Sequence, residues 1–437
     1  MSNTITTSFP IKDINTFKAK ALLWANQFDC CCYLDSNSYN ANRFHRFEAL
    51  IAAAPRTQLL HLPNTDTFAR LRQYHEINQS WLFGYFSYDL KNEVEHLYSN
   101  RFDGLGFPEF HCFAPSYLLQ VQKEEVLITA ENPPSIWKAI QQTPLHFHYL
   151  NAPPQLKARM PKAQYLKAVD QVREHIIQGD LYEMNLCQEF YARDVVADPA
   201  SLFYQLNQIA KAPFSAYYKL DHRYLLCSSP ERFLCKRGAD LFAQPIKGTI
   251  KRGRSPKQDQ QLRQLLIESE KDRAEHIMIV DLIRNDLARS CEAGSVKVEE
   301  LFGAYAFEQV HHLISTIKGT LRPEVHWTEA IRAAFPMGSM TGAPKVMSME
   351  LIEHYERSKR GLYSGSVGYI SPEGDFDFNV VIRSLQYNAL EEYLSFQVGG
   401  AIVYDSVAER EYEECLLKAK GILKALSLSV QETCIVG

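Results

Sequence analysis

The sequence contains no long apolar run: no stretch approaches the roughly 18 consecutive apolar residues that a membrane-spanning helix needs. The first ten residues, MSNTITTSFP, are polar and lack the apolar core of a signal peptide. Charge of one sign is also lacking, because 47 Lys and Arg are balanced by 51 Asp and Glu. The balance gives no bulk electrostatic reason to bind nucleic acid or an anionic membrane. We therefore expect a cytoplasmic protein that binds neither nucleic acid nor membranes.

Paired cysteine motifs are absent. None of the ten cysteines belongs to a CxxC pair, and only those at 30–32 are adjacent. Ten cysteines in 437 residues are too dilute for a secreted domain held together by disulfides. We interpret them as small buried side chains in a reducing compartment.

The common signatures of nucleotide-binding and zinc enzymes are missing too. The sequence has no GxxxxGK[ST] loop, no GxGxxG after a strand and no HExxH. Glycine-rich segments occur at 338–342, 365–368 and 399–400, but tight turns explain each of them as well as ligand binding does. What the sequence does contain is 46% hydrophobic residues, which is enough for a large globular core.

Helical and strand patterns are grouped along the chain. Residues 1–150 are irregular, with short aromatic runs, and the proline-rich segment 132–161 predicts a linker. Helical spacing occurs over 162–179, 257–291, 329–359 and 406–426, and strand patterns occur over 213–245 and 365–404. This grouping favours an α+β fold with antiparallel sheets, divided into a region 1–150 and a catalytic region 151–430.

The last predicted helix carries a stripe of charged residues. Ser406 followed by Glu409 predicts a capping box at its start. Glu411, Glu414 and Lys418 then share one face of the helix.

A second acidic pair, Asp272 and Glu275, has the same spacing on the helix predicted at 257–291. If the two pairs met across a cleft, their carboxylates would need a cation between them, and oxygen ligands suit Mg²⁺. The alternative is that both pairs belong to ordinary solvated helix faces.

Two basic residues lie in strand-like segments. Alternation in the strand predicted at 378–385 places Arg383 on an apolar face, where it needs an anion. A carboxylate ligand and a structural Asp or Glu would serve equally well. Lys247 follows a predicted strand; most such lysines are solvated, and a nucleophilic role would require a neutral amine.

Several long motifs resemble those of the chorismate-utilising enzymes, the family that includes anthranilate synthase component I and aminodeoxychorismate synthase component I. They are SPERF at 229–233, PIKGT at 245–249, AEHIMIVDLIRNDL at 274–287, FPMGSMTGAPK at 335–345 and GGAIV at 399–403. The resemblance covers residues 161–426 and extends loosely to 84–90 and to 34–36, which in the family lie near a tryptophan-binding pocket. It implies large antiparallel sheets packed in a sandwich, with helices outside and the active site in a cleft.

The resemblance also implies roles for individual residues. It implies Mg²⁺ held by Glu275 and Glu414, with Asp272 and Glu411 as supporting or water-mediated ligands. Glu231 resembles the general acid that protonates the departing C4 hydroxyl of chorismate. The implied substrate contacts are Arg383, Tyr369, Lys418, the backbone at Gly399 and Ala401, His312 and Thr249.

Lys247 distinguishes members of this family. Anthranilate synthases have alanine at the corresponding position, and in them ammonia attacks C2 of chorismate directly. Aminodeoxychorismate synthases resemble this chain in having lysine. The resemblance therefore implies that chorismate and ammonia are converted to 4-amino-4-deoxychorismate through a covalent Lys247 intermediate, on the route to 4-aminobenzoate and folate. A nearby Mg²⁺ would help to keep the amine neutral.

Three alternatives stay open. Anthranilate synthase component I is disfavoured by Lys247, and an isochorismate or salicylate synthase would need a separate general-base lysine that we cannot place. A silent tryptophan-binding partner is disfavoured by Glu231, Glu275, Glu414 and Arg383. The chain has no Gly-x-Cys-x-Gly turn like that of glutamine amidotransferases, so we expect a separate amidotransferase subunit to supply the ammonia.

Overall fold

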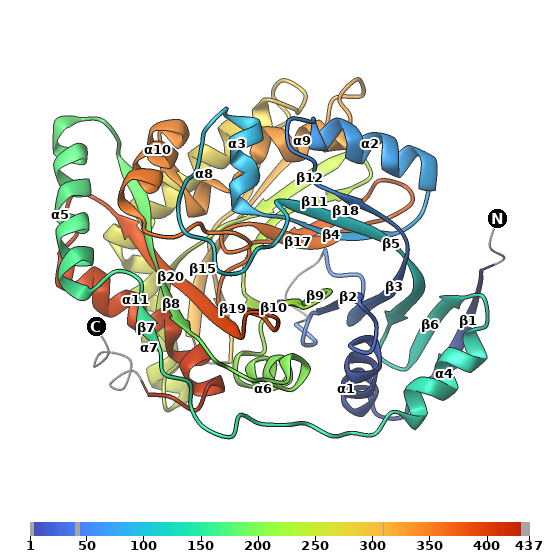
Figure 1. Ribbon diagram of the computed structural model, residues 1–437. Helices are drawn as coiled ribbons and strands as arrows, with labels where there is room; N and C mark the ends of the chain where they lie inside the picture. Colours follow the sequence, from blue (N-terminus) through green and yellow to red (C-terminus); the bar gives the residue numbers. More distant parts are fainter. Residues whose placement is uncertain (1–3, 40–43, 309, 430–437) are drawn as a thin grey trace.

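The structure is a computed structural model that describes residues 4–39, 44–308 and 310–429. In these residues one hydrogen-bonded sheet of 20 strands runs through the whole molecule. All pairings between its strands are antiparallel. The helices lie around the outside of the strands (Figure 1). The expectation of an α+β fold with antiparallel sheets is therefore confirmed.

The N-terminal region is more regular than its sequence pattern predicts. Its elements are β1 (Ile5–Pro10), α1 (Ile14–Ala25), β2 (Cys30–Asp35), β3 (Ala49–Leu60), α2 (Thr67–Asn78), β4 (Leu82–Phe86), α3 (Lys91–Val94), β5 (Phe110–Val121), β6 (Glu125–Ala130) and α4 (Pro133–Gln142). Helix α4 lies inside the predicted linker, so that prediction was wrong for its first part. The side chain of Asn132 caps the helix, and the prolines at its first positions lack only N–H groups that a helix start leaves unpaired.

The catalytic region follows the predicted grouping closely. Its elements are β7 (Lys157–Ala158), α5 (Lys162–Gln178), β8 (Glu183–Ala192), α6 (Pro199–Ala210), β9 (Phe214–Leu220), β10 (Arg223–Ser229), β11 (Arg232–Arg237), β12 (Asp240–Gln244), β13 (Ile246–Lys251), α7 (Pro256–Glu268), α8 (Glu270–Ala288), β14 (Lys297–Ala306), β15 (Val310–Thr320), α9 (Trp327–Ala334), β16 (Gly342–Ala343), α10 (Lys345–Tyr355), β17 (Ser366–Ile370), β18 (Phe376–Asn379), β19 (Ser384–Asn388), β20 (Tyr393–Ile402) and α11 (Ala408–Ala425). The helices predicted at 257–291 and 329–359 are each two helices. Across the described part of the chain, no helix is long and apolar enough to span a membrane.

Strands of the two regions pair directly with each other. Strand β2 pairs with β9, and β4 pairs with β17, so the sheet is continuous across residue 150. One hydrophobic core cluster contains residues from strands of both regions, including Cys30 and Cys32 of β2. Cys31, between them, points to the opposite face of the sheet and belongs to a different core cluster, which the helices cover. The nine described cysteines are free and buried, as expected; Cys434 lies outside the described residues. The division near residue 150 stays a prediction.

The start of α11 differs from the predicted capping box. Val407 occupies the N-cap position and makes no side-chain cap. Ser406 is buried, accepts a hydrogen bond from the Val403 N–H at 3.1 Å and donates one to Glu411 at 2.7 Å. Glu409 is exposed. The prediction was wrong because the Ser406 hydroxyl serves the preceding turn and the Glu411 carboxylate instead of the helix N–H groups.

Candidate active site

Lys247 lies on β13 and forms a buried ion pair with Glu183 at the start of β8. The distance from Nζ to Oε1 is 2.7 Å, and the side chains are 13% and 1% exposed. Burial lowers the pKa of Lys247, but the carboxylate of Glu183, with further contributions from Glu275 and Glu414, outweighs it and raises that pKa above its ordinary value. These residues therefore hold Lys247 as an ammonium ion.

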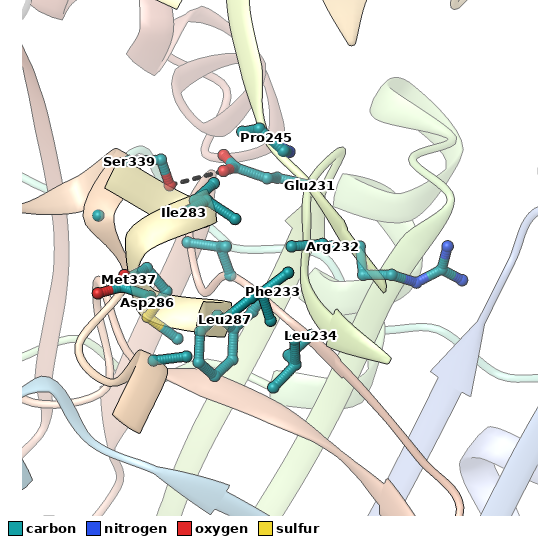
Figure 2. A pocket seen from close by; sticks show the side chains of 14 residues that line it. Glu231, Arg232, Phe233, Leu234, Pro245, Ile283, Asp286, Leu287, Met337 and Ser339 are labelled. Carbon is teal, nitrogen blue, oxygen red and sulfur yellow. Dashed lines mark hydrogen bonds between the residues drawn. The ribbon is translucent and has the colours of Figure 1, made fainter. Parts of the chain in front are cut away.

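Glu231 lies in the turn between β10 and β11. Its carboxylate accepts a hydrogen bond from the Ser339 hydroxyl at 2.6 Å (Figure 2). Glu231 is only 5% exposed. Burial raises the pKa of Glu231 to about 7, although the Ser339 hydrogen bond and the Lys247 charge oppose the rise. A carboxyl with this pKa can both give and take a proton near neutral pH.

A pocket adjoins Glu231. It is lined largely by apolar side chains from β11, β12, α8, α9 and the loop after α9, among them Phe233, Ile283 and Met337. In Figure 2 the Glu231 carboxylate and Ser339 lie at one end of this group of side chains. The apolar lining explains why the Glu231 carboxyl is held in a poorly solvated position.

Arg383 does not lie in a strand, contrary to the prediction from alternation. It falls between β18 and β19 with a φ of 52°, and its guanidinium donates to the Lys418 carbonyl at 3.0 Å. Lys418 in turn donates to the Gly399 carbonyl at 2.9 Å and pairs with Glu414 at 2.7 Å. The structure therefore brings Arg383, Lys418 and Gly399 together. Ala401 lies on the same strand as Gly399, opposite residue 185 of β8.

Tyr369 lies apart from this group. It is on β17, where its hydroxyl accepts from Arg237 at 3.2 Å, and it lines a second pocket together with residues 34–36. The tyrosine that interacts with Arg383 is Tyr363, which is buried and contacts the Cys187 sulfur at 3.6 Å. Sequence reasoning missed Tyr363 because it precedes β17 in a loop, where no periodicity fixes the direction of a side chain.

His312 and Thr249 face each other across β13 and β15. The Thr249 hydroxyl lies 2.8 Å from Nδ1 of His312. Burial, reinforced by the Arg383 charge, lowers the pKa of His312 to about 3. His312 is therefore neutral at physiological pH and can act as a hydrogen-bonding group but not as a cation.

The acidic pair of α8 approaches β13 at Gly248. A Cβ on Gly248, whose φ is 77°, would lie 3.2 Å from Cβ of Asp272, so only glycine lets the helix pack here without a shift. Glu275 lies one turn later, 3.8 Å from the Lys271 ammonium. Burial raises the pKa of Glu275 against the opposing charges of Lys247 and Lys271.

The acidic pair of α11 lies over Gly400 on β20, where a Cβ would make only ordinary van der Waals contact with it. A Cβ there would lie 3.4 Å from Glu411 and 3.7 Å from Glu414. Burial raises the pKa of Glu411, whereas the Lys418 ammonium lowers the pKa of Glu414. Lys271 of α8 also interacts electrostatically with Glu411 and Glu414, which places the two acidic pairs near one another.

The four carboxylates supply the hard oxygen donors that Mg²⁺ prefers. Within the described residues, however, no three or more His, Cys, Asp or Glu side chains are already grouped as a metal site. Mg²⁺ keeps several waters and needs few protein ligands, so the donor chemistry fits even without such a cluster.

Comparisons with known proteins agree with the family resemblance of the sequence motifs. The sequence profile of the chorismate binding enzymes matches residues 29–424. The chain is 39% identical over 350 residues to aminodeoxychorismate synthase component 1 of Klebsiella aerogenes, an overlap that covers 78% of this chain and 76% of that protein. It is 39% identical over 289 residues to anthranilate synthase alpha subunit 1 of Oryza sativa subsp. indica, covering 62% and 50%.

Solved structures of chorismate-utilising enzymes also match this chain. Anthranilate synthase component I from Streptococcus pneumoniae matches with a TM-score of 0.75 and 26% identity, over 86% of this chain and 92% of that one. The menaquinone-specific isochorismate synthase MenF from Escherichia coli has a TM-score of 0.78 over 97% and 94%, but at 20% identity it shows the fold alone. The expected fold and family resemblance are therefore confirmed.

Proposed function

The chain belongs to the chorismate binding enzyme family, and from this premise we propose that it is the synthase component of an aminodeoxychorismate synthase. In this proposal it converts chorismate and ammonia to 4-amino-4-deoxychorismate, a precursor of 4-aminobenzoate and folate. Relatives named aminodeoxychorismate synthase component 1 from K. aerogenes and E. coli, each 39% identical to the chain, support it. The single observation that carries the proposal is the position of Lys247, because its amine is buried in the same site as the carboxyl of Glu231.

The first half of the proposed reaction uses Lys247 as a nucleophile. The neutral amine adds at C2 of the chorismate ring, the ring double bonds shift, and the bond from C4 to its hydroxyl oxygen breaks. Glu231 gives its proton to that oxygen, which leaves as water. A pKa near 7, caused by burial, lets Glu231 carry this proton at neutral pH.

In the second half, ammonia adds at C4 and the lysine nitrogen leaves C2. The ammonium formed at C4 returns a proton to Glu231. Two displacements thus replace one difficult displacement, and the free amine of Lys247 is regenerated. Substrate carboxylates are held by the guanidinium of Arg383 and by the polar atoms around Lys418 and Gly399. The neutral His312 and the hydroxyl of Thr249 line the same side of β13 and β15.

Mg²⁺ would be held by Glu275 and Glu414, with Asp272 and Glu411 in support. When bound, the ion would supply positive charge that orients and polarises the ring carboxylate. The acidic side chains have the right chemistry, and the backbone approaches at Gly248 and Gly400 leave room for them.

A second candidate is anthranilate synthase component I. The similarity to a rice anthranilate synthase subunit and to the S. pneumoniae structure favours it, whereas Lys247 disfavours it. In either case we propose that ammonia comes from a separate glutamine amidotransferase subunit, in agreement with the names "component 1" and "component I" of the relatives.

Product identification tests the proposal. The purified chain is incubated with chorismate, ammonium and Mg²⁺, and the products are separated and identified by mass spectrometry. We expect 4-amino-4-deoxychorismate from the wild type, none from Lys247→Ala, and an unchanged yield from Lys251→Ala, which removes an exposed lysine of the same strand. Anthranilate as the main wild-type product would favour the second candidate, and full synthesis by Lys247→Ala would refute the lysine route.

A further inference from the structure

Glu183 is a fully buried carboxylate that the reaction described above does not use. Its Oε1 accepts a hydrogen bond from Lys247 Nζ at 2.7 Å, and its side chain is 1% exposed. Oε2 is also buried and, among the described residues, has no hydrogen-bond partner. Burying a carboxylate with one oxygen unpaired is costly, and a structural ion pair would gain from pairing both oxygens.

The backbone holds Glu183 firmly in this position. As the first residue of β8 it pairs with Ala343 of β16, and its carbonyl accepts from the Ser348 hydroxyl at 3.3 Å. Gly342 packs so closely that a Cβ there would lie 2.1 Å from the Glu183 carbonyl oxygen. Lys247 comes from a different part of the sheet, so the contact between the two side chains is set by tertiary structure.

A lysine that attacks carbon must first lose a proton, because only the neutral amine has a free lone pair. Four carboxylates face Lys247: Glu183 from β8, Glu231 from the turn before β11, Glu275 from α8 and Glu414 from α11. Glu414 is 2.7 Å from Lys418, and Glu231 must itself be protonated to act as an acid. The nearby ring of His276, whose pKa burial lowers to about 4, hydrogen-bonds the Lys247 carbonyl at 3.4 Å and not the amine. Among the residues that the structure describes, Glu183 has the one carboxylate in hydrogen-bond contact with Nζ.

We propose that Glu183 is the proton acceptor for Lys247, an inference that rests on the proposed function. The ammonium and the carboxylate become a neutral amine and a neutral carboxylic acid, so no net charge enters or leaves the buried pair. The lone pair of the amine then forms the bond to C2 as the bond from C4 to oxygen breaks and the Glu231 proton leaves with that oxygen. When ammonia has added at C4 and the nitrogen leaves C2, Glu183 returns the proton to Lys247.

Burial favours this transfer, because it penalises a pair of charges more than a pair of neutral groups and so opposes the attraction that holds Lys247 as an ammonium ion. The proton passes along the hydrogen bond from Nζ to Oε1 of Glu183. Rotation about the Cε–Nζ bond then turns the lone pair of the neutral amine toward the substrate.

A proton kept within the pair has a measurable consequence. In the wild type the lysine does not depend on solvent to lose its proton, whereas in Glu183→Gln it does. We therefore expect adduct formation at Lys247 in Glu183→Gln to be about 10²-fold slower than in the wild type at pH 7, within the range of general base catalysis. The ratio of variant to wild-type rate should rise with pH. The contribution of Glu231 is common to both proteins and cancels in this ratio.

The experiment is a single turnover with chorismate and Mg²⁺ but without ammonia, in which the Lys247 adduct is followed by peptide mass spectrometry from pH 6 to 9. Glu183→Asp keeps a carboxylate, so its ratio to wild type should be intermediate and independent of pH. Glu353→Gln is the matched control, because it removes the carboxylate 2.9 Å from the buried Lys91, and it should leave the rate unchanged.

Equal rates in Glu183→Gln and wild type, or a slower rate with a ratio that does not change with pH, would overturn the proposal for Glu183 alone. A wild type that forms no Lys247 adduct would overturn the proposed function and with it this inference. Thermal unfolding midpoints of all variants establish that each is folded when its rate is measured.

Discussion

Replacing Glu231 by glutamine should stabilise the protein at alkaline pH while removing its general acid. Burial raises the pKa of Glu231 from its ordinary value of 4.5 to about 7. Between these two values the native state holds a proton that the unfolded chain has released, so stability is lost as the pH rises through this window. Glutamine is neutral at every pH and can still accept the hydrogen bond from Ser339, so the variant escapes this loss.

The magnitude follows from the same two values. They differ by about 2.5 pH units, and each unit corresponds to about 1.4 kcal/mol, so the carboxylate costs about 3 kcal/mol of unfolding free energy above pH 7. Urea unfolding at pH 5 and pH 8 measures the effect. Part of the loss has already occurred at pH 5, so the advantage of Glu231→Gln over wild type should be about 2.5 kcal/mol larger at pH 8 than at pH 5.

Glu174→Gln, which removes an exposed carboxylate of α5, controls for the loss of one negative charge. An advantage of Glu231→Gln that is the same at both pH values, or that is larger at pH 5, would refute the argument that burial raises the pKa of Glu231.

Three further predictions concern metal, substrate and nitrogen. Glu275→Gln and Glu414→Gln should each lose most Mg²⁺-dependent activity. Glu231→Gln should bind Mg²⁺ and chorismate normally in calorimetry but turn over ~10²–10⁴-fold more slowly. An equal loss of Mg²⁺ affinity in all three variants would contradict this division of roles. Arg383→Lys should raise the KM for chorismate on the order of tenfold because bidentate contact is lost, while Tyr369→Phe, in the other cavity, should leave KM unchanged; steady-state kinetics with the opposite ranking would restore Tyr369 to the substrate site. The chain alone should use ammonium salts as its nitrogen source, best at alkaline pH, where more of the ammonium is present as free ammonia. It should use glutamine only after a glutaminase subunit is added. Glutamine-dependent synthesis by the rigorously purified chain would show this to be wrong.

Local patterns were sufficient to predict much of the catalytic region. The helix at 162–179 has a clear 3.6-residue period and a terminal glycine, and the strands between 214 and 244 are separated by turns at Asp221 and Gly238. The N-terminal region looks irregular in sequence because the buried first half of β3 is apolar on both faces and so shows no alternation, although the aromatic run at 82–86 does form β4. The prolines of α4 are typical of a linker, although here they stand where a helix tolerates them.

The candidate site was predictable only where its residues share a motif. Lys247 and Glu231 stand in such motifs, but their partners Glu183 and Ser339 are 64 and 108 residues away in the chain. No periodicity links residues at those separations, since the contacts arise from the antiparallel sheet and from loop packing. Tyr363 was not predicted for a related reason, because it lies in the loop before β17, the strand that carries Tyr369.

The covalent state of Lys247 tests the central claim most directly. The wild-type chain is incubated with chorismate and Mg²⁺ without ammonia, digested, and examined by peptide mass spectrometry; ammonium is then added to a second portion before digestion. The account predicts an adduct on Lys247 with the mass of chorismate less one water, which disappears with ammonium as 4-amino-4-deoxychorismate forms. Consumption of chorismate with Lys247 unmodified at every time point would contradict it.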